Sequence, residues 1–141
     1  MTEEDARALT GHSQSVLKNA NLIHDYLKPL WEKHYISSEQ VNFTDSKDDA
    51  INLKTFAAKL ADLIIKKDKI ANIEPVFNQV NTIVQNINTT YLKDSWINQN
   101  NYKPMKEIQN SLAYIKSYID KQKQIDAQKP PVSDVNSPTP P

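Results

Sequence analysis

The chain has 141 residues, enough for one domain, and its 17 basic residues balance its 17 acidic residues. It has no cysteine and one glycine, Gly11, which excludes disulfides and thiolate metal sites and argues against the glycine-rich phosphate loops of kinases and Rossmann enzymes. The zero net charge favours neither nucleic acid nor an acidic membrane surface as a partner. The chain has no run of about 18 apolar residues, so we expect no membrane insertion.

The first predicted helix spans residues 3–35. One of its faces carries apolar residues and two histidines from end to end: Leu9, His12, Val16, Ala20, Ile23, Leu27, Leu30, Trp31 and His34. Gly11 and Pro29 fall on the opposite side, where water can satisfy a broken backbone hydrogen bond. We therefore expect the first helix to be kinked near Pro29, and Gly11 is a second place where it can be interrupted.

The second predicted helix spans residues 46–69 and has the most regular apolar face of the chain. Ser46, followed three positions later by Asp49, resembles a capping box at its start. Ile51 and Ile65 widen the apolar face, so we expect this helix to be the most buried of all.

The third predicted helix spans residues 72–92, with Asn72 as its expected N-cap. Its apolar residues, beginning at Ile73, recur with helical rather than strand periodicity. Four amides lie together along one edge of that apolar seam: Asn78, Asn81, Gln85 and Asn88. This amide stripe is either a solvated flank or a surface that binds a partner.

The fourth predicted helix spans residues 103–126 and has Pro104 in its first turn. Five apolar residues at near-heptad spacing form its seam, which faces either the core of its own bundle or a second chain in a homodimer: Met105, Ile108, Leu112, Ile115 and Ile119. Tyr114 and Tyr118 lie off this seam and four positions apart, hence on one side of the helix. We expect them to bind a protein partner or to pack against the first helix or the loop at 93–102.

The four predicted helices, joined by short loops, indicate an all-α fold, an antiparallel up-down four-helix bundle over residues 1–128. Residues 129–141 contain five prolines in thirteen positions. Because proline fixes φ and lacks an N–H group, we expect a disordered proline-rich C-terminal tail, acting as a linker or as a ligand for a proline-binding groove.

Three histidines are the residues best suited to chemistry, and their spacing does not suggest a metal site. His12 and His34 lie about 33 Å apart along one helix, given the ~1.5 Å rise per residue. Asp25 is next to His24, but neighbours on a helix point about 100° apart. In the stretch GHSQSVLKN, His12 remains a candidate phosphoacceptor, because helical bundles can serve as histidine phosphotransfer modules.

These patterns favour a non-enzymatic protein without cofactor or metal that acts through protein–protein contacts. Candidate roles are an adaptor, a chaperone, or an accessory or immunity-type binder. The alternatives are the phosphotransfer module using His12, and an extracytoplasmic surface or lipoprotein domain whose signal peptide lies upstream. The expected compartment is the cytoplasm, or the periplasm or cell surface under the last alternative.

Overall fold

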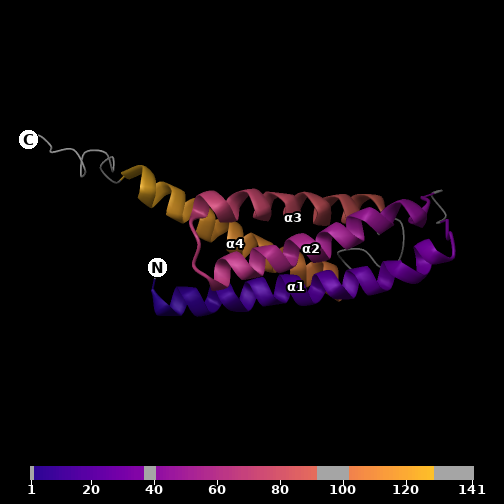
Figure 1. The fold of residues 1–141 in the computed structure, drawn as a ribbon, viewed down its shortest axis with the longest axis horizontal. Coiled ribbons are helices and arrows are strands. Elements are labelled where there is room, and N and C mark those ends of the chain that lie inside the picture. The colour runs from indigo at the N-terminus through magenta and orange to yellow at the C-terminus, as the bar shows by residue number, and fades with distance from the viewer. Residues whose placement is uncertain (1, 37–40, 92–101, 129–141) are drawn as a thin grey trace, which may run out of the picture.

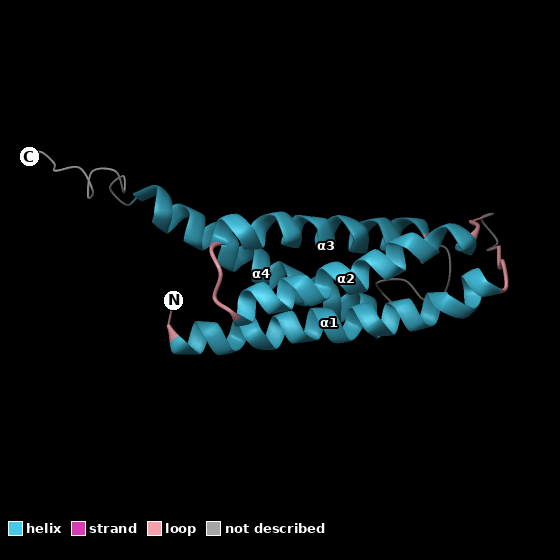
Figure 2. Cartoon of the chain, in the orientation of Figure 1, coloured by secondary structure: helices cyan, strands magenta, loops and turns pink. Residues whose placement is uncertain are grey.

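The fold is all-α, as the sequence predicts. In the computed structural model, the described residues (2–36, 41–91 and 102–128) form four α-helices and one short 3-10 helix. The helices are α1 (Glu3–Glu32), α2 (Ser46–Ile65), α3 (Ile70–Thr90) and α4 (Lys103–Gln128), with the 3-10 helix η1 (Phe43–Asp45) before α2. They lie side by side as an elongated bundle (Figure 1), and the described segments between them are short (Figure 2).

Each helix packs against two neighbours. Helix α1 contacts α2 and α4, and α3 contacts the same two helices from the other side. The core lies between them and is built from one stripe of each helix: Leu9, Val16, Ala20, Ile23, Leu27 and Trp31 of α1; Ala50, Leu53, Ala57, Leu60 and Ile64 of α2; Ile73, Val76, Phe77, Val80, Val84 and Ile87 of α3; Met105, Ile108, Leu112, Ile115 and Ile119 of α4. The seam predicted for the fourth helix is therefore buried within its own chain.

Helix α1 begins where the sequence suggests and continues without interruption. Thr2 caps it, since its hydroxyl accepts a hydrogen bond from the backbone N–H of Asp5 at 3.0 Å. The helix runs through Gly11 and Pro29, which are both exposed. The predicted interruption of the helix at Gly11 is therefore wrong. The kink at Pro29 stays a prediction. The helix ends at Glu32, and His34, which the sequence places in the apolar seam, is exposed with a positive φ of 53°.

The starts of α2 and α3 differ from the predicted caps. Ser46 is not the first residue of a capping box; its hydroxyl donates to the carbonyl of Phe43 at 2.6 Å and is buried. Helix α3 begins at Ile70, so Asn72 lies inside it and donates to the carboxylate of Asp68 at 2.8 Å. In both cases the side chain expected to cap the helix instead donates a hydrogen bond to a residue that precedes the helix.

Helix α2 is not buried on all sides. Ile51 and Ile65, expected to widen its apolar face, are 41% and 51% exposed. They project away from the stripe that includes Leu53 and Leu60, both of which are fully buried. The predictions for the loop at 92–101 and for the tail at 129–141 lie outside the described residues.

Replacing Gly11 by alanine is expected to raise the free energy of unfolding by about 0.5–1 kcal/mol. Alanine loses less backbone entropy than glycine when a helix forms. A Cβ atom at Gly11 would meet nothing within 4 Å, so the gain is not offset by a clash. Urea unfolding of the Gly11→Ala variant tests this; a loss of stability would mean that the backbone at Gly11 departs from a regular helix.

Tyr102 anchors the start of α4 to α1. Its hydroxyl donates to the backbone carbonyl of Leu22 at 3.3 Å, and its ring lies 5.3 Å from that of Tyr26. Burial, followed by the charges of Tyr26 and Asp25, raises the pKa of Tyr102 from 10.0 to about 12. The folded chain therefore holds this proton more tightly than the unfolded chain does.

This shift predicts a loss of stability in strong alkali. The contribution of neutral Tyr102 is fully present below pH 10 and disappears as the pH rises towards about 12. The Tyr102→Phe variant, measured by urea unfolding across that range, should lose less stability than the wild type. The matched Tyr35→Phe variant, at a half-exposed ring, should follow the wild type. An unchanged slope for Tyr102→Phe would contradict the assignment.

Candidate functional site

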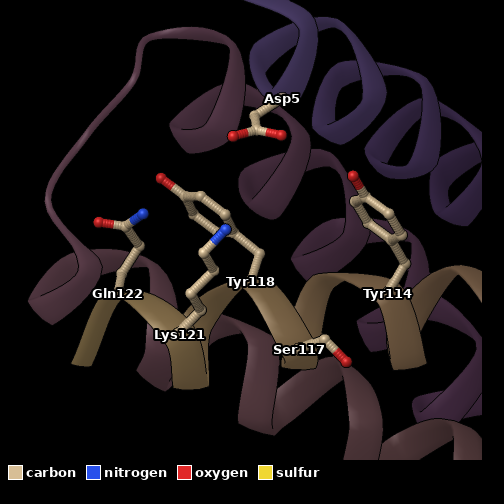
Figure 3. A pocket seen from close by; sticks show the side chains of 6 residues that line it. All are labelled: Asp5, Tyr114, Ser117, Tyr118, Lys121 and Gln122. Carbon is tan, nitrogen blue, oxygen red and sulfur yellow. The ribbon is translucent and has the colours of Figure 1, made fainter. Parts of the chain in front are cut away.

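The two off-seam tyrosines line a shallow groove between the start of α1 and the second half of α4. The groove has a volume of about 160 Å³ and is lined by Asp5, Tyr114, Ser117, Tyr118, Lys121 and Gln122. Figure 3 shows both tyrosine side chains rising from α4, with Asp5 on the facing helix. Neighbouring positions, such as Ile115, are buried in the core, so the tyrosines are held on a rigid helix rather than on a loop.

The two tyrosines differ in exposure. Tyr114 is 38% exposed, whereas Tyr118 is partly buried and packs against the core. Burial, followed by the negative charges of Asp5 and Asp126, raises the pKa of Tyr118. The groove therefore combines aromatic surface with the carboxylate of Asp5.

His12 of α1 contacts Tyr114 but is not among the residues that line the groove. The two rings are stacked, with centroids 4.2 Å apart and planes 22° from parallel, and Nδ1 of His12 lies 3.1 Å from the hydroxyl oxygen of Ser111. The place of His12 in the apolar seam suggests that it is fully buried. In the structure its side chain is only half-buried. One face and one nitrogen of its ring are thus engaged. Its role as a phosphoacceptor stays a prediction.

The charged groups near the groove fall into two kinds. Lys116 pairs with Asp120 at 2.8 Å, and Lys123 pairs with Glu74 at 3.0 Å. Within the described residues, neither Asp5 nor Lys121 has an ion-pair partner. These two opposite charges remain available to a ligand in the groove.

The structure separates the four residues of the amide stripe. Asn78 and Gln85 are exposed, Asn81 is half-buried and Asn88 is buried. Asn78 also lines a second groove, of about 370 Å³, between α2 and α3, beside Phe56 and Ile83. The stripe is therefore not a continuous exposed surface, because its C-terminal end turns into the bundle.

One polar contact that joins α2 and α3 is not predictable from the sequence. The side-chain amide of Asn86, outside the predicted stripe, donates to the carboxylate of Asp49 at 2.7 Å. Nothing in the sequence distinguishes this asparagine from its neighbours. Which amide finds a partner depends on the register between α2 and α3.

A third groove, of about 500 Å³, lies at the other end of α1 and includes His24, Trp31 and His34. Nδ1 of His24 is 3.0 Å from a carboxylate oxygen of Asp25, so these adjacent residues do interact, contrary to the expectation from helical geometry. His34 lies 3.2 Å from the hydroxyl of Thr44. In the described part of the chain, no three histidine or acidic residues are grouped closely enough to hold a metal ion.

No protein-family model, curated protein or solved structure matches this chain. Among the helices of residues 2–36, 41–91 and 102–128, none has both the length and the apolar composition that a membrane span requires.

Proposed function

We propose that this protein is a non-enzymatic helical bundle that binds another protein through the tyrosine groove, defined by Asp5, Tyr114, Ser117, Tyr118, Lys121 and Gln122. The observation that carries the proposal is the pairing of Tyr114 and Tyr118 on one side of α4, beside an unpaired carboxylate. Tyrosine is enriched among the residues that dominate binding energy, because it offers a large rigid surface and a polar tip. A groove on packed helices also presents these groups at little entropic cost.

The proposal includes an antiparallel up-down arrangement. The order of contacts along the helices supports it: His12 meets Ser111, whereas Leu22, further along α1, meets Tyr102 before α4. Lys123, near the end of α4, pairs with Glu74, near the start of α3. An antiparallel bundle brings the first turns of α1 next to the last turns of α4, which is what the groove requires.

The double variant Tyr114→Ala/Tyr118→Ala is expected to weaken partner binding about 30-fold or more, the loss typical of a binding hot spot. The measurement is quantitative capture of cellular proteins on the immobilised full chain, compared between wild type and variant. Tyr35→Ala is the matched control, because Tyr35 is 51% exposed at the other end of the bundle. Equal recovery on all three proteins would contradict the proposed surface.

Two other proposals stay separate from this one. Phosphotransfer through His12 predicts a phosphohistidine signal that the His12→Gln variant loses. A surface or lipoprotein domain predicts a signal peptide in the upstream coding sequence. The hydroxyl of Ser111 lies 3.1 Å from Nδ1 of His12, so a phosphoryl transfer to this ring would use Nε2.

A further inference from the structure

We propose that the tyrosine groove binds an arginine side chain of the partner, with its guanidinium paired to Asp5 and stacked on Tyr114 and Tyr118. This inference rests on the proposed function and names the group that the groove would recognise.

The first argument is the convergence of acceptors. In Figure 3, the side chains of Tyr114 and Tyr118 both rise from α4 on the side where Asp5 lies, and the carboxylate of Asp5 lies between their hydroxyls in this view. Within the described residues, none of these three polar groups has a hydrogen-bond or ion-pair partner on its side-chain oxygens. A planar ligand with several N–H donors would pair with the carboxylate through its edge and leave its flat face for a tyrosine ring.

The second argument is local charge. The first turn of α1 carries Glu3, Glu4 and Asp5. The nearby lysines of α4, Lys116 and Lys123, are already paired with carboxylates. The side of the groove formed by α1 is therefore negative, although the chain as a whole is neutral, so a positive group of a partner is attracted to this end of the bundle.

The third argument selects arginine over lysine. A guanidinium is planar, carries five N–H donors and stacks on aromatic rings, whereas an ammonium is a compact and strongly hydrated point charge. Tyrosine faces add a cation–π attraction of about 0.5–1 kcal/mol at exposed sites. The one arginine of this chain, Arg7, does not fill the groove, since it lines a different one with Glu3 and Lys67.

Lys121 opposes such a ligand. It lines the groove one turn after Tyr118 and has no ion pair among the described residues. Its positive charge repels a guanidinium, so its removal should strengthen binding. A purely apolar interface would not predict this gain in affinity when Lys121 is replaced.

The test is an NMR titration of the full chain, isotope-labelled on its tyrosine rings, with three blocked amino acids as probes: N-acetyl-arginine amide, N-acetyl-lysine amide and N-acetyl-citrulline amide. Citrulline keeps the shape of arginine without its charge. We expect saturable shifts of Tyr114 and Tyr118, but not of Tyr35, with arginine, weaker shifts with lysine and none with citrulline. Shifts of equal affinity with citrulline would overturn the proposal.

Matched variants make the charge argument quantitative. Asp5→Asn should weaken arginine binding roughly fivefold, and Lys121→Gln should strengthen it roughly twofold, as expected for partly exposed charge pairs. Glu4→Gln removes the same charge one residue away, at an exposed position that does not line the groove, and should change the affinity less. Equal effects of Asp5→Asn and Glu4→Gln would overturn the direct pairing.

The two proposals can fail independently. Partner capture that depends on Tyr114 and Tyr118 but not on Asp5, together with no arginine response, would overturn this inference and leave the proposed function standing. Arginine binding in the groove, with partner capture that ignores both tyrosines, would overturn the proposed function instead.

Discussion

Replacing Leu60 by alanine is expected to lower the free energy of unfolding by about 2–5 kcal/mol. Leu60 lies in the second half of α2 and has no exposed surface. Its loss removes buried apolar area and leaves a cavity, because helices packed on two neighbours can close around it only in part. Urea unfolding followed by circular dichroism measures the change.

The control is Ile65→Ala, in the same helix. Ile65 is of similar size and 51% exposed, so its replacement should change the stability by no more than about 0.5 kcal/mol. Similar losses for the two variants would contradict the burial of Leu60 in the core.

Replacing Phe43 by alanine should cost about 3–5 kcal/mol. Phe43 belongs to η1 and is only 3% exposed, with the rings of Tyr35 and Tyr91 at 5.6 and 6.3 Å. The hydroxyl of Tyr91 also donates to the carbonyl of Asp45, the last residue of η1, at 3.1 Å. Phe43 therefore closes one end of the core, and its truncation exposes that end to water.

The matched control for Phe43 is Tyr35→Ala, which removes one ring of the same cluster from a half-exposed position. We expect a much smaller loss for Tyr35→Ala, measured in the same urea unfolding experiment. A small loss for Phe43→Ala would show that η1 does not contribute to the core.

The helices were predictable because their apolar residues follow the helical period over many turns. The seam of α4, from Met105 to Ile119, is buried at every predicted position. Phe43 was missed because it stands alone in a loop sequence, without periodic neighbours. Its burial depends on how η1 packs against the helices, which local pattern does not encode.

The errors at the caps have a similar cause. Ser46 has the residue type of an N-cap, but its hydroxyl is taken by the carbonyl of Phe43 in the preceding turn. The exposure of Ile51 and Ile65 depends on which sides of α2 its neighbours occupy. A single helix sequence gives the width of an apolar face, but not how much of it the neighbouring helices cover.

The candidate site was predictable in part. The spacing of Tyr114 and Tyr118 indicated that both side chains lie off the seam and on the same side of the helix. The contribution of Asp5 and the stacking of His12 on Tyr114 were not predictable, because they depend on the register between α1 and α4. His12 and Ser111, for example, are 99 positions apart in the sequence.

The most direct test of the central claim is site-specific photo-crosslinking in cells that express the protein. A photoreactive phenylalanine replaces Tyr114 in one version of the chain and the half-exposed Tyr35 in the other. The proposed binding surface predicts a discrete crosslinked partner from position 114, lost when Tyr118→Ala is added, and none from position 35. Crosslinks of equal yield from both positions, or a product from position 35 alone, would contradict it.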